Sequence, residues 1–413
     1  MKFFKFVLLT LIALPAILWA EGGSVYSRLG IGDLTYSYSA RRIGMGELGV
    51  AVFDREFIGS INPASWTRLN MTRFETALNY QNFKTQSTDI SSYHSYTNFS
   101  GALIGVPLER DLGLSLVGGL IPYSTVNYKV VDKHPSSDYP HNVTYDGSGN
   151  VSKAFIGGSY KTPWDISIGA SFDYYIGKVD YHSTIDFTSN SSYYSAEYQK
   201  TYKTAGIGGS FGIISNDLSK MLGLSKISEM RVGLALNVAS SFNSDSSYIV
   251  YNTNGTDTLA TGKTNADLPL RFAAGLSFVY NKAYNITLDY LYQPWNKYKF
   301  GTQSALNLRS LQKVSAGIEY KNPDMRETGF FERTMVRGGV SYEQTQYQLY
   351  GQGINEYSVY AGFSFPLAYE NSIDLAFQYG VRGTTDMSLV KEKIFRTNVT
   401  VSLGELWFFR PER

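Results

Sequence analysis

The side chains that could support acid–base or metal chemistry are few and scattered. The four histidines, which lie in or beside predicted loops, are His94, His134, His141 and His182. Serine and aspartate are abundant, so a Ser-His-Asp arrangement is conceivable, but the sequence contains no nucleophile elbow and no ordered pairing of these residues. The chain has no cysteine, which excludes disulfides and thiolate metal sites. We therefore expect no catalytic residue, no metal, no cofactor and no enzyme activity.

Two short patterns resemble binding sites but have simpler explanations. Residues 44–49 read Gly-Met-Gly-Glu-Leu-Gly, a literal GxGxxG, yet no buried strand precedes it and no βαβ unit follows. Glycines here are better explained by tight packing or positive φ angles in a compact, irregular segment. His134 and His141 lie near several aspartates and could bind a cation, but a solvated polar loop is the better explanation.

The overall composition points to a membrane protein without membrane helices. The 37 basic and 35 acidic residues give a net charge of +2, which argues against a nucleic-acid partner. Hydrophobic residues make up 43% and charged residues only 17%, while 33 tyrosines raise the aromatic share to 15%. A mean hydropathy of −0.18 is too polar for a bundle of membrane helices. An aromatic, glycine-rich chain of this kind is typical of a transmembrane β-barrel.

The first twenty residues have the pattern of a secretory signal peptide. A short basic start is followed by an apolar run from Phe6 to Trp19, and Ala20 stands at the expected cleavage position. The run is too short to span a membrane, although a membrane-anchored N-terminus is the alternative. An exported chain of this composition predicts an outer-membrane protein of a Gram-negative bacterium, cleaved near Ala20.

Beyond Thr72 the chain alternates between apolar and small or polar residues with period two. Such alternation gives a strand one apolar face and one face of small or polar side chains, although the strands of a soluble sandwich would alternate as well. About fourteen segments reach the length of a tilted membrane strand. Their approximate centres are Leu78, Leu103, Leu116, Ile156, Phe172, Gly208, Leu236, Leu276, Leu288, Ala316, Val340, Ala361, Phe377 and Val401.

The lengths of the connections favour a barrel over a sandwich. Short links such as 161–165 and 281–284 alternate with long polar links, which we expect at 131–150, 184–196 and 243–267. Short periplasmic turns and long extracellular loops produce this alternation. Two links on the short side break the trend, at 216–229 and 321–334. The sequence thus predicts an all-β fold: a closed antiparallel transmembrane barrel over residues 73–413.

The last predicted strand ends in a pattern that resembles the insertion signal of outer-membrane barrels. Gly404, Trp407 and Phe409 have the spacing of that signal, and the two aromatics would lie in the interfacial girdle. An ordinary aromatic strand is the alternative, and four further residues follow the last aromatic. The signal implies recognition by the barrel-insertion machinery.

Residues 21–72 lie between the signal peptide and the first strand and show no sustained period. The run Ala40-Arg41-Arg42-Ile43-Gly44-Met45-Gly46 and the later Asn62-Pro63-Ala64-Ser65 resemble the N-terminal hatch of the FadL-type outer-membrane transporters of hydrophobic compounds (the FadL/TodX family). Later strands agree loosely, and the opening residues look like a divergent branch.

The resemblance implies a barrel of about fourteen strands plugged by this hatch. In such proteins, apolar ligands such as long-chain fatty acids are captured outside, enter the lumen and leave sideways through a gap in the wall. Hatch residues implied by the resemblance are Arg41, Gly44, Gly46, Asn62, Pro63 and Ala64. Asn62 to Ala64 would form a rigid turn, although an ordinary turn without a gating role explains it equally well.

Three residues of the third strand suggest where such a gap would lie. Gly118 and Gly119 weaken a strand and permit a bulge, and Pro122 removes a donor from the hydrogen-bond ladder. We therefore expect a lateral opening near these three residues. The alternative is that the glycine pair packs against a bulky hatch residue and that Pro122 lies at the membrane edge.

Several arginines are candidates for binding a ligand carboxylate. Arg42 lies on the hatch, and Arg271 and Arg337 lie on the inward faces of their strands; arginine binds carboxylates in bidentate fashion. For each of them an ion pair or a hydrogen bond inside a polar lumen is the simpler alternative.

Two classes of function fit the sequence. A transporter of hydrophobic or amphipathic small molecules predicts an apolar pocket between loops and hatch and a lateral gap at the third strand. A binding platform of the same fold, used by a protein-secretion machine, predicts a filled lumen and long ordered loops; a purely structural barrel is a third reading. The expected partners are outer-membrane lipid and a hydrophobic ligand, with the protein as a monomer because a closed barrel has no edges to satisfy.

Overall fold

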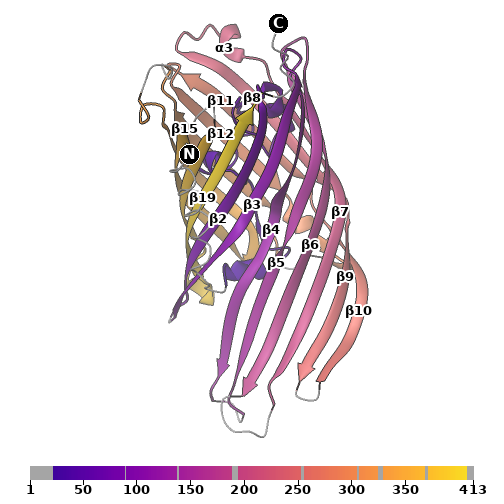
Figure 1. The fold of residues 1–413 in the computed structure, drawn as a ribbon. Coiled ribbons are helices and arrows are strands. Elements are labelled where there is room, and N and C mark those ends of the chain that lie inside the picture. The colour runs from indigo at the N-terminus through magenta and orange to yellow at the C-terminus, as the bar shows by residue number, and fades with distance from the viewer. Residues whose placement is uncertain are drawn as a thin grey trace, which may run out of the picture.

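The wall of the molecule is a closed antiparallel β-barrel of fourteen strands (Figure 1). The computed structural model describes residues 22–88, 90–136, 139–187, 194–252, 255–304, 307–323, 329–367 and 371–406. Successive strands pair with their neighbours, and the ring closes where the last strand pairs with the first barrel strand from Lys391↔Gln86 to Glu405↔Thr72. Closure pairs both edges of the sheet, as a wall in contact with lipid requires.

Each expected strand centre lies within a strand, so the predicted fold class is confirmed. Two wall positions are each built from two consecutive strands, because β7 pairs first with β9 and then with β8, and β11 continues β10. The barrel strands are β2 (Thr72–Gln86), β3 (Ser91–Glu109), β4 (Leu114–His134), β5 (His141–Lys161), β6 (Ser167–Phe187), β7 (Ala196–Ile214), β8 (Ile227–Ala239), β9 (Phe242–Asn252), β10 (Gly255–Asp267), β11 (Arg271–Tyr280), β12 (Tyr284–Gln293), β15 (Leu311–Tyr320), β16 (Met335–Leu349), β17 (Gln352–Pro366), β18 (Ser372–Arg382) and β19 (Lys391–Glu405).

Short elements complete the described fold. The hatch carries η2 (Val25–Arg28), β1 (Asp33–Leu34), α2 (Ala40–Ile43) and η3 (Pro63–Arg68). The connections carry α3 (Leu218–Met221), η4 (Trp295–Lys297), β13 (Lys299–Phe300), β14 (Gln303–Ser304) and η6 (Asp386–Ser388). No helix among the described residues is long and apolar enough to cross a membrane.

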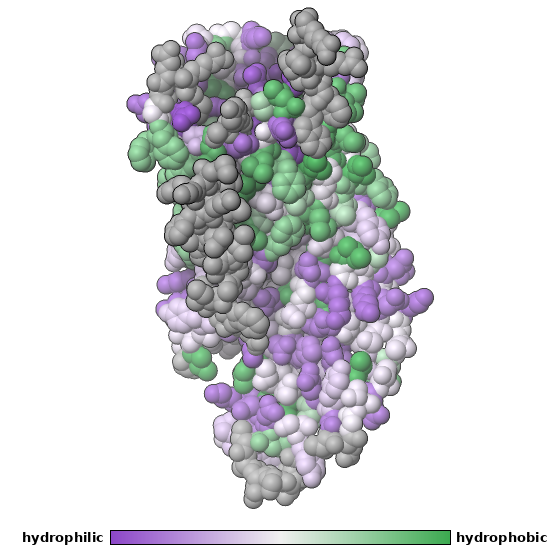
Figure 2. All heavy atoms as spheres, viewed as in Figure 1, coloured by the Kyte–Doolittle hydropathy of each residue, from purple (hydrophilic) through white to green (hydrophobic). Residues whose placement is uncertain are grey.

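The outward face of the barrel is apolar over one part of its height. Figure 2 shows this belt in green in the upper half of the view, with a mostly polar surface below it. Exposed apolar side chains that face away from the lumen include Leu116, Ile156, Phe172, Phe211, Leu234, Leu288, Val340 and Val359. Exposed apolar side chains at this density match a surface that faces hydrocarbon.

Two of the three long links predicted from the sequence are largely strand. β4 and β5 stay paired as far as His134↔His141, and β9 and β10 stay paired as far as Gly255↔Asn252. The prediction of polar loops at 131–150 and 243–267 was therefore wrong. These strands continue past the apolar belt, where both faces are polar and the alternation that marks a membrane strand disappears.

The extended strands make one end of the wall one-sided. β4, β5, β6, β7, β9 and β10 reach the lower end of Figure 1, whereas β2, β3, β12 and β15–β19 end higher. We call the protruding part of these six strands the protruding half-sheet.

The hatch lies inside the barrel against a row of inward-facing glycines. They come from seven different strands: Gly169, Gly212, Gly233, Gly275, Gly317, Gly339 and Gly362. A Cβ atom on Gly317 would lie 2.3 Å from the carbonyl oxygen of Met45, and one on Gly339 would lie 2.6 Å from the backbone nitrogen of Gly46. The small face of the strands therefore lets the hatch backbone touch the wall.

Replacing Gly339 with alanine should destabilise the protein, because the new Cβ forces the hatch away from β16. We expect a loss of about 1–3 kcal/mol in the free energy of unfolding, as for other overpacked interiors. Gly338 is the matched control, because a Cβ there would meet nothing closer than 3.8 Å. Gly338→Ala should change the stability by less than about 0.5 kcal/mol. Urea unfolding in lipid or detergent measures both; equal stabilities would contradict close contact between hatch and wall.

Candidate functional site

The middle of the lumen is filled by ion pairs between hatch and wall. Arg41 Nη2 lies 2.6 Å from Asp54 Oδ1 within the hatch and 2.9 Å from Glu319 Oε1 on β15. Arg337 on β16 extends the network, with Nε 2.7 Å from Glu319 Oε2 and Nη1 3.3 Å from Asp374 Oδ1. All five side chains are buried, so each charge depends on its partners.

A second group of ion pairs holds the hatch through Glu47. Lys313 on β15 and Arg396 on β19 each contact a Glu47 oxygen, at 2.6 and 2.5 Å. Lys313 Nζ also lies 3.1 Å from Glu343 Oε2, and Tyr36 donates a 2.7 Å hydrogen bond to Glu343 Oε1. Sequence reasoning missed these residues, since single charges on inward strand faces do not reveal which hatch residue they meet.

The environment of two hatch carboxylates favours their charged form. Burial raises the pKa of Asp54, but Arg41 and Arg42 outweigh burial and leave this pKa below its usual value. Burial likewise raises the pKa of Glu47, and Lys313 and Arg396 reverse the effect. Because both pKa values are lowered on folding, the stability they contribute is present above the unfolded pKa and is lost as pH falls through the folded one.

The three candidate partners for a ligand carboxylate differ in their surroundings. Arg42 is paired with Asp54, and Arg337 is paired with Glu319 and Asp374. Arg271, by contrast, has no carboxylate within ion-pair distance among the described residues. Its Nε donates to Gln293 Oε1 at 3.0 Å, and its buried Nη2 atom lacks a hydrogen-bond partner.

Aromatic rings surround Arg271. Its guanidinium carbon lies 4.8 Å from the ring centre of Tyr123 and 5.8 Å from that of Tyr36. Tyr123 packs edge-on against Tyr175, whose ring centre lies 5.0 Å from that of Phe242. A chain of rings thus leads from this arginine towards the vestibule, the space between the half-sheet and the hatch.

The vestibule contains a cavity of about 390 Å³ between the half-sheet and the hatch. Gly30 and Ile31 of the hatch form its floor, and apolar and aromatic side chains dominate its walls: Val151, Val179, Tyr181, Tyr202, Phe242, Tyr298 and Phe300, with Lys200 among them. Burial raises the pKa of Tyr298, so its hydroxyl stays protonated. The cavity can take an apolar or amphipathic molecule.

The Asn62-Pro63-Ala64 segment joins hatch and wall. Asn62 caps η3, where its Oδ1 accepts a 3.0 Å hydrogen bond from the Ala64 amide, and its Nδ2 donates to the Val50 carbonyl at 2.8 Å. The same Nδ2 donates to the Leu234 carbonyl on β8 at 3.2 Å. Gly44 lies against Gly362, and Gly46 lies against Ser315. These residues therefore anchor the hatch.

The wall changes its pairing close to Gly118, Gly119 and Pro122. β3 and β4 pair through Gly118 and Gly119, but the ladder ends at Ala102↔Leu120, although both strands continue. Each strand is irregular at this level, with a register shift at Ser100 in β3 and at Tyr123 in β4. Pro122 lies two residues beyond Leu120, the last paired residue of β4, and has no amide hydrogen with which to extend a ladder.

A groove lies where the two strands separate. This cavity of about 340 Å³ is lined by residues of β3, β4 and β5, among them Tyr96, Phe99, Leu120, Pro122, Thr125 and Asn127. Phe99 and Leu120 are exposed. On the lumen side the hatch strand β1 takes the place of β3, with Asp33 opposite Thr125 and Leu34 opposite Ser124. The edge of β4 is therefore satisfied by the hatch.

The end of the barrel near α3 is charged instead. A cavity of about 560 Å³ there is lined by seven basic and six acidic side chains, including Arg68, Asp165, Lys220 and Arg231.

In the described part of the chain no group of three His, Asp or Glu residues is placed to hold a metal ion. Gly404 lies in β19, whereas Trp407, Phe409 and the expected signal peptide lie outside the described residues.

Replacing Arg337 with methionine should strongly destabilise the protein, because Glu319 and Asp374 would keep buried charges with one cation fewer. We expect a loss of about 3–5 kcal/mol in the free energy of unfolding. The control is Lys178→Met, since Lys178 pairs with Asp180 at 2.8 Å but is 54% exposed, and should cost less than about 1 kcal/mol. Urea unfolding decides; similar losses would mean that the luminal pairs are not structural.

Solved structures with this architecture are hydrocarbon channels and related barrels. The chain superposes on a TodX monoaromatic hydrocarbon channel mutant (TM-score 0.60, 14% identity, 89% of this chain and 99% of that one). It also superposes on the P. putida toluene transporter TodX (0.58, 15%, 91% and 100%) and on a Pseudomonas aeruginosa FadL homologue (0.59, 12%, 90% and 97%). At these identities the likeness shows the fold.

Comparison with curated proteins gives no match. The model of one protein family, described as BamG, matches residues 1–412, which is nearly the whole chain. The chain therefore belongs to the BamG family and has the fold of the FadL-type outer-membrane channels.

Proposed function

We propose that this protein takes up hydrophobic or amphipathic small molecules from outside the cell and releases them sideways into the outer membrane. The observation that carries the proposal is the end of the β3–β4 ladder at Ala102↔Leu120. A membrane barrel normally pairs its strands throughout, because unpaired backbone groups are costly in lipid. A wall that separates next to exposed apolar residues suits the exit of an apolar molecule.

The route begins in the vestibule. The cavity of about 390 Å³ is apolar, lies between the half-sheet and the hatch, and has room for part of an alkyl chain or an aromatic ring. Arg271 is the best candidate for an acidic head group, since Arg42 and Arg337 are already paired with hatch and wall carboxylates. A fatty acid would place its carboxylate at Arg271 beyond the aromatic rings. Gly118, Gly119 and Pro122 end the route at the wall.

A reversible cross-link tests the exit. Leu34 and Ser124 are paired across β1 and β4, a spacing that suits a disulfide in a chain with no native cysteine. Uptake of a radiolabelled long-chain fatty acid by cells carrying Leu34→Cys/Ser124→Cys should fall at least about tenfold under oxidising conditions, because the exit is then closed by a covalent bond. Reduction should restore it. Full uptake by the oxidised variant would reject lateral exit.

Filling the cavity tests capture. Val179→Trp places a large side chain in the vestibule, whereas Lys178→Trp places it on the outer surface of the same strand. Binding of the same fatty acid to purified protein should weaken about tenfold or more for Val179→Trp and stay within about twofold for Lys178→Trp. Equal binding by both variants would mean that the ligand lies elsewhere.

A second candidate function has support of its own. The family name points to a barrel-assembly or outer-membrane context. The ion-paired hatch fills the lumen, and the half-sheet exposes tyrosines such as Tyr145 and Tyr251 on long paired strands. Aromatic surfaces of this kind are common in protein interfaces. On this reading the barrel is a platform that holds a protein partner of an assembly or secretion machine.

Deleting the gene separates the two functions. A platform for barrel assembly predicts lower amounts of other outer-membrane barrels in the deletion strain. Fatty-acid uptake, divided by the total amount of outer-membrane barrel protein, should then be unchanged. A transporter predicts lost uptake and a normal outer-membrane protein profile. Quantitative proteomics of the outer membrane beside the uptake assay decides between them.

A further inference from the structure

One segment of the hatch covers the groove between β3 and β4 from the inside. We call residues 24–35 the cover segment. It is held to β4 mainly by main-chain contacts, because Asp33 and Leu34 pair with Thr125 and Ser124, and the Thr35 amide donates to the Tyr123 carbonyl at 3.0 Å. Ser27 Oγ both donates to the Asn127 carbonyl and accepts from its amide, each at 3.0 Å. These bonds occupy the edge of β4 that β3 has left.

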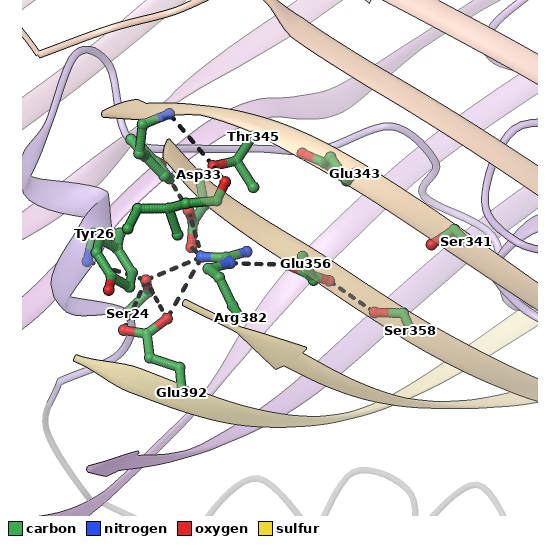
Figure 3. Close-up of polar contacts among 12 residues, drawn as sticks. Ser24, Tyr26, Asp33, Ser341, Glu343, Thr345, Glu356, Ser358, Arg382 and Glu392 are labelled. Atoms are coloured by element: carbon green, nitrogen blue, oxygen red, sulfur yellow. Dashed lines mark hydrogen bonds and ion pairs between the residues drawn. The ribbon is translucent and has the colours of Figure 1, made fainter. Parts of the chain in front are cut away.

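The opposite side of the cover segment contacts the wall around Arg382 (Figure 3). Tyr347 donates to Asp33 Oδ1 at 2.7 Å, and Gln346 Nε2 donates to the Gly32 carbonyl at 3.1 Å. Ser24 Oγ and the Val25 amide donate to Glu392 on β19 at 2.9 and 2.7 Å. Arg382, the last residue of β18, donates from Nη1 to both Asp33 oxygens at 2.9 and 3.0 Å and to Ser24 Oγ at 3.0 Å. Its Nε donates to Glu356 Oε2 at 2.8 Å, which fixes the guanidinium on the wall. The arginine thus joins both ends of the cover segment to β17 and β18.

Arg382 neutralises several nearby negative charges, so its loss should leave these charges without a cation. Three carboxylates surround it, since Glu392 Oε2 lies 3.7 Å from Nη1 beside Asp33 and Glu356. The Glu392 and Glu356 side chains are buried, and that of Asp33 is 20% exposed. Without the guanidinium, these negative charges would repel one another in a space with little water. Of the three, only Asp33 belongs to the cover segment, whereas Glu356 and Glu392 lie on wall strands.

We propose that Arg382 is the latch that keeps the cover segment against β4 and so keeps the lateral groove closed. The latch rests on the proposed lateral exit but makes a separate claim about where the cover segment lies. Arg382 acts through Asp33 and is a positioning residue. When the Arg382–Asp33 contact is lost, the cover segment leaves β4, and the groove becomes continuous with the vestibule.

The absence of cysteine allows a direct test. Thr125→Cys places one thiol at the groove, opposite Asp33. A membrane-impermeant maleimide should label it slowly in the otherwise unchanged chain. Adding Arg382→Gln or Asp33→Asn should raise the labelling rate by about tenfold or more, as expected when a buried ion pair loses one member and a local segment opens. Asp33→Asn leaves the wall intact, so it keeps the test decisive if Arg382→Gln fails to insert.

A matched control removes a different hatch–wall ion pair. Arg396 pairs with Glu47 and not with the cover segment, so Arg396→Gln should leave the labelling of Thr125→Cys within about twofold. Heat-modifiable gel mobility checks that each variant is a folded barrel. Unchanged labelling in folded Asp33→Asn and Arg382→Gln, or an equal increase in Arg396→Gln, would overturn the latch.

The labelling result is independent of transport. If labelling rises but the oxidised Leu34→Cys/Ser124→Cys variant still takes up fatty acid, the latch stands and lateral exit fails. If labelling does not rise while that cross-link blocks uptake, lateral exit stands and the latch is overturned. Contacts other than Arg382–Asp33 then hold the cover segment against β4.

Discussion

The structure depends on one constraint: in a bilayer, each backbone amide and carbonyl of the wall must find its partner within the protein. Fourteen strands satisfy it by closing through β19 and β2. Where β3 and β4 separate, the same constraint recruits the hatch, since β1 pairs with β4 on the lumen side. The hatch is thus part of the hydrogen-bonded wall as well as its filling.

Two different interactions hold the hatch in place. Over the row of glycines, its backbone touches the wall directly, at contacts that a side chain would prevent. Elsewhere, ion pairs of Arg41, Lys313 and Arg382 connect it to neighbouring strands. Glycine contacts fix where the hatch backbone lies, and charges decide which residues must stay together. Buried charges can also be separated by a competing charge, so they suit contacts that open.

The two candidate functions use different parts of one molecule. The transporter reading uses the vestibule cavity, Arg271 and the groove beside Pro122. The platform reading uses the protruding half-sheet, which extends beyond the apolar belt on one side only. A filled lumen is compatible with both, because a lateral route does not need a passage along the barrel axis.

The sequence by itself determined the barrel, because the alternation of side chains along a strand follows from local geometry and survives in each of the fourteen segments. It also indicated the hatch and the irregular stretch at Gly118, Gly119 and Pro122. Only the tertiary structure decided that the polar links continue as strands, that Arg42 and Arg337 are paired while Arg271 is not, and that Arg382 meets Asp33. Arg382 and Asp33 are 349 positions apart. The other pairs are closer in sequence, but they too form only when separate segments pack together, and no local pattern records which charge will face which.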